Sequence, residues 1–235
     1  MTDRTFTPAL GRFALPRLYD SLIALTRERL WRSMIAMHAA LRAGDVVVDV
    51  GCGTGSLALL LHAVEPSARV IGVDPDPKVL AAARRKAGPA AGVEWRTGMG
   101  DALADIVGAG TADTIVSSLV LHQCPVPVKR AILASMLDTL RPGGKLVIAD
   151  FGHQRTRPMR LAFRLVQLAD GREDTQFNAD GKLPGLISEV GFVQVREAAT
   201  VPTVNGSISL YTARRGQWPG RPPRASAPSS GASPG

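Results

Sequence analysis

Short apolar runs recur along the middle of the chain, and each is followed by a stretch in which apolar residues lie three or four positions apart. The runs have the length and the Val and Ile content of buried strands, whereas the stretches between them have helical periodicity. This alternation predicts an α/β fold with a mostly parallel sheet. The expected strands are 46–50, 69–74, 93–96, 112–118, 145–150, 192–197 and 207–213.

The segments between and around these strands predict helices and turns. The expected helices are 57–61, 75–87, 126–140 and 183–189, and a turn is expected at 141–144. Residues 16–41 also have helical spacing, and the polar cluster at 26–29 divides them. Residues 1–15 are expected to be an irregular arm. From residue 216 the chain is too rich in Pro, Gly, Ser and Arg to pack, so 216–235 is expected to be disordered.

A glycine loop, Gly51-Cys52-Gly53-Thr54-Gly55, connects the first strand to the first helix of the sheet region. Glycines on alternate positions permit positive φ and remove Cβ atoms that would hold a ligand away from the backbone. The free N–H groups of the following helix face the same point, which favours a nucleoside site. Asp74 ends the second strand about 20 residues later, where a ribose diol needs a carboxylate. Ser56 stands where a dinucleotide loop has its third glycine, which disfavours NAD.

The segment VVDVGCGTG, residues 47–55, resembles motif I of the class I S-adenosylmethionine (SAM) dependent methyltransferases. The likeness continues in Gly100-Asp101-Ala102 and in LRPGG at 140–144, and it covers about residues 16–215. It is nearest to the small-molecule branch that includes ubiquinone and menaquinone biosynthesis enzymes. The resemblance implies a Rossmann-like, seven-stranded, mostly parallel sheet with an antiparallel last strand, helices on both faces and an N-terminal helical lid.

The domain organisation follows from this resemblance. Residues 1–42 form the arm and lid helices, 43–215 form the SAM-binding domain, and 216–235 form the tail. The variable, substrate-facing insertion of the family corresponds to the basic segment at 153–177.

The resemblance implies SAM as cofactor and S-adenosylhomocysteine as product. Asp101 would then contact the adenine amino group, although it could equally cap a helix, as Asp74 could. An unpaired carboxylate in a buried strand is costly, so Asp49 is expected to fix the glycine loop or the methionyl amine. The expected cofactor-binding residues are Asp49, Gly51, Cys52, Gly53, Gly55, Asp74, Pro75, Asp101, Ala102, Ser118 and Leu119.

Three residues are candidates for catalysis. His122 follows the fourth strand, has a side chain suited to proton transfer near neutrality, and resembles the family's histidine in LH-x-x-P. His153 follows the fifth strand, and Tyr19, with Asp20, resembles a YD pair near the family's lid. The alternatives are a histidine that only packs, an exposed histidine and a core aromatic residue.

Composition restricts the partners. The net charge of +8 lies mostly at the two ends, in residues 1–42 and 213–235, and the core has no basic stripe interleaved with aromatic residues. We therefore expect no nucleic-acid partner. No apolar run approaches the roughly 20 residues that span a bilayer, so no stable membrane insertion is expected, while peripheral contact stays open.

Cys52 and Cys124 are isolated thiols without metal-ligand spacing, and the first residues show no secretory pattern. We expect a cytoplasmic protein without a metal site, as a monomer or a homodimer.

These observations favour in-line transfer of a methyl group from SAM to a small, hydrophobic acceptor. Two alternatives stay open. The chain could be a phospholipid N-methyltransferase, since its N-terminal helices are basic and carry Met and Trp. It could also be a SAM-binding protein without transfer activity.

Overall fold

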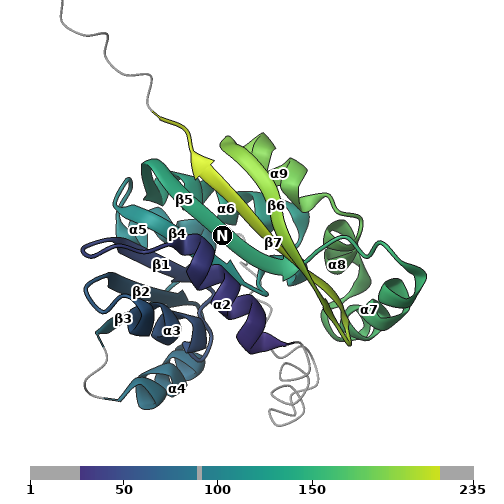
Figure 1. Ribbon diagram of the computed structural model, residues 1–235, viewed down its shortest axis with the longest axis horizontal. Coiled ribbons are helices and arrows are strands. Elements are labelled where there is room, and N and C mark those ends of the chain that lie inside the picture. The colour runs from purple at the N-terminus through teal and green to yellow at the C-terminus, as the bar shows by residue number, and fades with distance from the viewer. Residues whose placement is uncertain (1–26, 89–91, 218–235) are drawn as a thin grey trace, which may run out of the picture.

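A seven-stranded sheet forms the centre of the computed structural model, which describes residues 27–88 and 92–217 (Figure 1). The order of the strands is β3-β2-β1-β4-β5-β7-β6, and β7 runs antiparallel to both of its neighbours while the other pairs are parallel. This confirms the predicted fold class. The strands are β1 (Val46–Val50), β2 (Arg69–Asp74), β3 (Val93–Thr97), β4 (Ala112–Ser118), β5 (Leu140–Phe151), β6 (Phe192–Thr203) and β7 (Gly206–Arg215).

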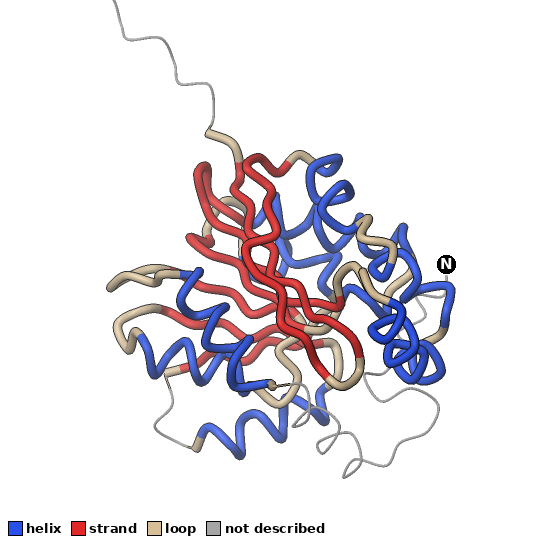
Figure 2. Tube along the Cα trace, turned by 45° about the vertical axis from the view of Figure 1, so that its right-hand side comes forward, coloured by secondary structure: helices blue, strands red, loops and turns tan. Residues whose placement is uncertain are grey.

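Helices cover both faces of the sheet (Figures 1 and 2). They are α2 (Glu28–Ala39), α3 (Ser56–Val64), α4 (Pro77–Ala87), α5 (Leu103–Val107), α6 (Val126–Thr139), α7 (Arg157–Asp170), α8 (Arg172–Ala179) and α9 (Leu183–Val190), with short 3-10 turns η1 (Gly100–Ala102) and η2 (Leu121–Gln123). Two apolar clusters fill the space between the helices and the sheet. One joins the sheet to α6 and α9, and the other joins it to α2, α3 and α7.

The strands alternate between these clusters, as the pleat requires. In β1, Val48 packs with α6 and α9, whereas Val47 packs with Trp31 of α2 and Leu57 of α3. Asp49 has the same parity as Val47, so its carboxylate lies on the α2 and α3 side of the sheet. The only acidic side chain of β1 therefore lies on the face of the sheet covered by α3, the helix that follows the glycine loop.

The N-terminal segment is partly described. The helix α2 begins after Arg27, which has φ of +56° and lies in the polar cluster at 26–29. Residues 16–26, on the other side of the predicted division, lie outside the described residues. The helix α2 packs on the sheet against β5 and β7, so residues 28–39 form part of a covering layer. Tyr19, Asp20, the arm and the tail beyond residue 217 lie outside the described residues. None of the described helices has the length and apolar character needed to cross a bilayer.

Two expectations from the sequence need correction. The turn at 141–144 belongs to β5, which begins at Leu140 and contains a shift in its pairing with β4 between Ala112 and Thr114. Gly143, with φ of +77°, lets the strand bend without ending. The last two strands are also longer than predicted, and they form a hairpin whose tip lies beside α7 (Figure 1).

Candidate functional site

The glycine loop rests on the end of β2. The N–H groups of Gly51 and Cys52 both donate to the carbonyl of Val73, at 2.8 and 3.1 Å. A Cβ on Gly51 would lie 2.3 Å from Val120, so this glycine lets the loop after β4 approach. Gly53 has φ of +53°, and a Cβ there would meet no atom within 4 Å. The loop is therefore closed by protein at Gly51 and open at Gly53.

Asp74 holds this loop in place. Its Oδ2 accepts the N–H of Gly53 at 2.9 Å, and its Oδ1 accepts the N–H of Asp76 at 2.9 Å. Burial raises the pKa of Asp74, and the two hydrogen bonds act in the opposite direction. Asp76, rather than Asp74, caps α4, through a bond from the N–H of Lys78 at 2.7 Å. The Asp74 carboxylate keeps lone pairs for a diol, since each oxygen accepts only one of these bonds.

Asp49 lies in a different environment. It is fully buried, and neither carboxylate oxygen makes a hydrogen bond of good geometry with the described residues. Burial raises the pKa of Asp49 to about 7, although Arg32 on α2 and the backbone of Ala58 lower it. Such a group is costly unless it receives a donor. The two predicted roles for Asp49, fixing the glycine loop and binding the methionyl amine, both stay predictions, and the missing hydrogen-bond donor leaves room for a cationic ligand.

The other predicted cofactor residues lie along the same edge of the sheet. Asp101 and Ala102 form part of η1, which follows β3. Ser118 ends β4, and Leu119, with φ of +54°, donates its N–H to the carbonyl of Ala149 at 2.9 Å. Parallel strands bring their carboxyl ends together, so these residues form one row across β3, β2, β1 and β4.

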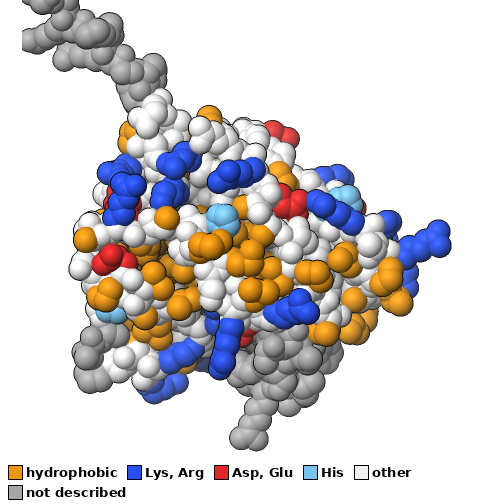
Figure 3. Space-filling view, viewed as in Figure 1, with side chains coloured by type: hydrophobic (Ala, Val, Ile, Leu, Met, Phe, Trp, Pro, Cys, Tyr) orange, Lys and Arg blue, Asp and Glu red, His pale blue; other side chains and the backbone are white. Residues whose placement is uncertain are grey.

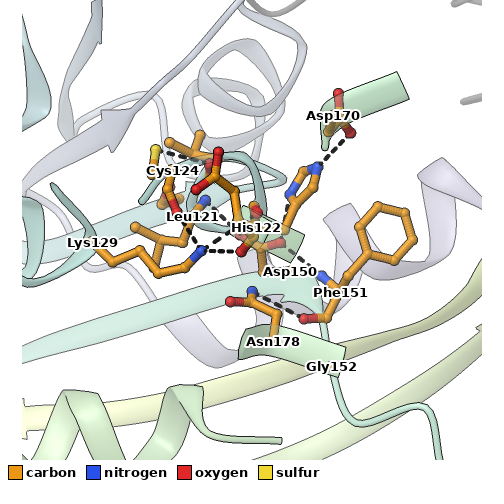
Figure 4. A network of polar contacts seen from close by, with 12 residues as sticks. Leu121, His122, Cys124, Lys129, Asp150, Phe151, Gly152, Asp170 and Asn178 are labelled. Atoms are coloured by element: carbon orange, nitrogen blue, oxygen red, sulfur yellow. Dashed lines mark hydrogen bonds and ion pairs between the residues drawn. The ribbon is translucent and has the colours of Figure 1, made fainter. Parts of the chain in front are cut away.

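His122 is the centre of a second group at this edge (Figure 4). Its side chain is buried, with Nδ1 2.8 Å from Oδ1 of Asp150 and Nε2 3.3 Å from Oδ2 of Asp170. Asp150 is the last residue but one of β5 and is fixed by the N–H groups of Leu121 and Phe151, both at 2.7 Å. Asp170 is the last residue of α7 and is partly exposed. The imidazole therefore lies between a buried carboxylate and one nearer the solvent.

The two carboxylates set the charge of His122. Burial lowers the pKa of the imidazole, but Asp150 and Asp170 outweigh it and raise the pKa to about 9. At neutral pH both ring nitrogens therefore carry protons and donate to the carboxylates. In this arrangement His122 cannot accept a proton until Asp170 moves away from Nε2.

The sequence prediction did not include Asp150 or Asp170. Asp150 could have been found, because an acid that ends a parallel strand next to β4 must lie at the edge that holds His122. Asp170 comes from the insertion helix, whose position on the sheet no periodicity specifies.

Lys129 forms a clamp on the loop after β4, because it donates hydrogen bonds to the backbone carbonyls of that loop (Figure 4). It is fully buried on α6, and its Nζ donates to the carbonyls of Cys124 at 2.6 Å, Asp174 at 2.7 Å and His122 at 3.4 Å. Burial lowers the pKa of Lys129, while Asp150 opposes the change. The lysine thus joins α6, η2 and α8 through backbone carbonyls.

His153, the second catalytic candidate, lies apart from this network. It is exposed, and its ring packs beside Gly181 between α8 and α9. Its carbonyl accepts a bond from Ser207 at 3.2 Å. Tyr19, the third candidate, lies outside the described residues.

Comparison with known proteins agrees with this geometry. Residues 47–144 match the family described as a methyltransferase domain. Demethylmenaquinone methyltransferase of Thermus thermophilus is 34% identical over 149 residues, which cover 63% of this chain and 64% of that protein. The ubiquinone/menaquinone biosynthesis C-methyltransferase UbiE of Syntrophotalea carbinolica is 28% identical, over 88% of this chain and 93% of that protein. Over residues 47–144 and beyond, the chain is therefore similar to SAM-dependent methyltransferases.

Among solved structures, the chain resembles magnesium protoporphyrin IX methyltransferase of Synechocystis with bound S-adenosylhomocysteine. The TM-score is 0.62 at 19% identity, over 87% of this chain and 90% of the other. This likeness confirms the fold. The chain spans 64% of the length of the Thermus relative and 62% of the length of the 2-phytyl-1,4-naphthoquinone methyltransferase of Thermosynechococcus vestitus.

The residues at the strand ends fit SAM. The unpaired carboxylate of Asp49 lies where a ligand ammonium group would satisfy it. The open side of Gly53 leaves space for a ligand against the backbone, and Asp74 lies beside it through a hydrogen bond. In the part of the chain that the structure describes, no group of three or more His, Cys, Asp or Glu side chains could hold a metal ion.

Proposed function

We propose that this chain is a methyltransferase, which transfers the methyl group of SAM to a small, hydrophobic acceptor with a hydroxylated aromatic ring. Relatives named as demethylmenaquinone and 2-phytyl-1,4-naphthoquinone methyltransferases support a quinone-like acceptor in reduced form. The single observation that carries the proposal is the fully buried carboxylate of Asp49, which lacks a hydrogen bond of good geometry among the described residues, beside a glycine loop that is open at Gly53.

In this proposal the strand-end residues hold the cofactor. Asp49 binds its ammonium group, Asp74 its ribose diol and Asp101 its adenine amino group. When bound, SAM supplies an electrophilic methyl group on a sulfonium sulfur. The chain's own contribution is to hold the acceptor in line with that group and to exclude water, effects that reach about 7–11 kcal/mol in the best intramolecular reactions.

His122 is the proposed base. Its Nε2 faces outward toward Asp170, while Asp150 fixes the proton on Nδ1. When an acceptor hydroxyl replaces Asp170 at Nε2, the imidazole loses one carboxylate, and burial lowers its pKa. The neutral ring then takes the hydroxyl proton, which contributes about 10²–10⁴ in rate for a well-placed base. His153 and Tyr19 stay as predictions for contacts with the acceptor.

A cytoplasmic location is part of the proposal. The thiols of Cys52 and Cys124 are both free, which accords with a reducing compartment.

The test measures binding and transfer separately. The purified chain is titrated with SAM in a calorimeter and then incubated with SAM and a panel of reduced naphthoquinols, benzoquinols and phosphatidylethanolamine vesicles. We expect SAM binding, release of S-adenosylhomocysteine and a quinol product that is heavier by one methylene unit in mass spectrometry. Methylation of the phospholipid alone would overturn the acceptor class, and binding without any product would indicate a SAM-binding protein without transfer activity.

A further inference from the structure

The helix α7 turns a row of leucines outward. Leu161, Leu165 and Leu168 are 64%, 59% and 84% exposed, whereas Phe163 and Val166 of the same helix are buried. At 100° per residue, spacings of four and three place the three leucines in one row, on the side opposite the buried pair. A helix whose only apolar contact was the protein core would carry polar residues in that row.

Arginines follow the leucine row along the same helix. Arg157, Arg160 and Arg164 are all exposed, and their spacing of three and four forms a row beside the leucines. Among the described residues none of the three takes part in an ion pair. In the space-filling view, hydrophobic and Arg side chains lie together at the right-hand edge, over α7 (Figure 3).

The surface is held rigidly on the domain. The ring of Phe163 lies 5.1 Å from the ring of Phe151 at the end of β5, and Gly206 in the β6–β7 hairpin approaches Phe163 closely. At the other end of the helix, Asp170 contacts His122. The 14 residues of α7 extend for about 21 Å, so the leucine and arginine rows form one preformed strip.

We propose that this strip, made of Leu161, Leu165, Leu168, Arg157, Arg160 and Arg164, binds the surface of an anionic lipid bilayer. The helix lies in the plane of the interface, with the leucines at the acyl boundary and the arginines among the phosphate groups. Charge complementarity selects this partner. A second copy would oppose one arginine row to another, and residues 1–26 carry three arginines and two aspartates, so neither offers the missing negative charge. The inference goes beyond the proposed methyl transfer and does not depend on it.

Docking of α7 on a bilayer would bring the lipid surface close to the group around His122. Asp170 is on α7, so the helix that meets the lipid also carries the carboxylate that covers Nε2 of His122. A hydrophobic acceptor that leaves the bilayer beside α7 would arrive next to this residue.

The test is sedimentation of the full chain with phosphatidylcholine vesicles, with and without phosphatidylglycerol, in the absence of SAM and acceptor. We expect binding to the anionic vesicles. The variant Leu161→Gln, Leu165→Gln, Leu168→Gln is expected to bind at least about tenfold more weakly. The variant Arg157→Gln, Arg160→Gln, Arg164→Gln is expected to bind on the order of a hundredfold more weakly at low salt, because each basic residue near an anionic surface contributes to binding.

The matched control is Val64→Gln combined with Arg85→Gln, at an exposed apolar residue and an exposed basic residue of α3 and α4. It is expected to bind within about twofold of the unchanged chain. All these side chains are exposed, and circular dichroism checks that each variant is folded. Failure of the unchanged chain to bind anionic vesicles would overturn the proposal. The proposal would also be overturned if the leucine variant bound the vesicles normally. It would be overturned as well if light scattering showed that the unchanged chain is a dimer and the leucine variant a monomer.

Discussion

The Nε2 atom of His122 lies 3.3 Å from Oδ2 of Asp170, so this contact joins the loop after β4 to the end of α7. Asp150 holds the other ring nitrogen at 2.8 Å and is itself fixed by backbone N–H groups. Asp170 is the more exposed of the two carboxylates and belongs to a helix on the surface. Asp170 can therefore be displaced with less rearrangement of the core than Asp150, and its position decides whether His122 can act as the proposed base.

The first prediction concerns Asp170→Asn. Removal of this charge is expected to lower the pKa of His122 from about 9 toward its ordinary value of 6.5, since Asp150 alone must then balance burial. NMR titration of the imidazole measures this change. Glu173→Gln is the control, because it removes an exposed carboxylate from the neighbouring helix α8. An unchanged imidazole pKa in Asp170→Asn would contradict the assigned network.

The second prediction concerns stability. The pKa of His122 is raised on folding, so its contribution is complete below about pH 6.5 and is lost as the pH rises through about 9. Between pH 7 and 8.5 the free energy of unfolding is expected to fall by about 1 kcal/mol per pH unit. Urea denaturation at several pH values measures this slope. The same experiment on His122→Asn should give a flatter line, and equal slopes would argue against a raised pKa.

The fold and the placement of the candidate cofactor residues at one edge of the sheet could be predicted from the sequence because each depends on local pattern. The strand 46–50 is an apolar run, the glycines that follow it require positive φ, and Asp74 ends the next strand. Parallel topology then brings these segments together without further information. The extension of β5 through 141–144 was missed because the same glycines form a turn or a bent strand according to their partner strand.

The network around His122 depends on contacts that no local pattern specifies. Lys129 reads as a surface residue of an amphipathic helix, yet it is fully buried because three backbone carbonyls converge on it. Asp170 reads as the polar end of a basic helix. Its contact with His122 depends on how α7 packs on Phe151, which is a tertiary property.

The third prediction concerns Asp49 and rests on the proposed cofactor. Its pKa of about 7 means that the carboxylate takes up a proton just below neutrality. A cationic ligand binds the ionised form, so SAM affinity is expected to fall as the pH drops from 7.5 to 5.5, by up to about tenfold per unit. Calorimetry at several pH values measures this. In Asp49→Asn we expect weak binding without that pH dependence, and a wild-type affinity independent of pH would contradict the role of Asp49.

The fourth prediction compares two glycines. Gly53→Ala and Gly110→Ala both place a Cβ at positive φ, +53° and +66°, with no atom within 4 Å. Each is expected to reduce stability by about 1–2 kcal/mol through backbone strain. Only Gly53 lies in the loop proposed to bind the cofactor, so only Gly53→Ala should also weaken SAM binding. The loss is expected to be tenfold or more if the ligand occupies the open space, since about 1.4 kcal/mol is a factor of ten. Equal SAM affinities in the two variants would show that the glycine loop is not part of the SAM site.

The fifth prediction concerns the buried clamp at Lys129. In Lys129→Met the carbonyls of Cys124 and Asp174 lose their charged donor inside the protein, and an unpaired buried acceptor costs about 1–3 kcal/mol. We expect a loss of about 2–4 kcal/mol in the free energy of unfolding. The clamp also positions η2, so we expect methyl transfer to lose kcat while SAM affinity changes little.

Lys145→Met is the matched control for this effect. Lys145 also donates to two backbone carbonyls, those of Ala39 at 2.7 Å and Ala40 at 3.3 Å, but it lies where β5 meets the end of α2 and is less buried. Its replacement is expected to cost less stability and to leave kcat unchanged. If both variants lose stability and kcat in the same proportion, the fall in rate follows general destabilisation, and Lys129 has no specific part in positioning His122.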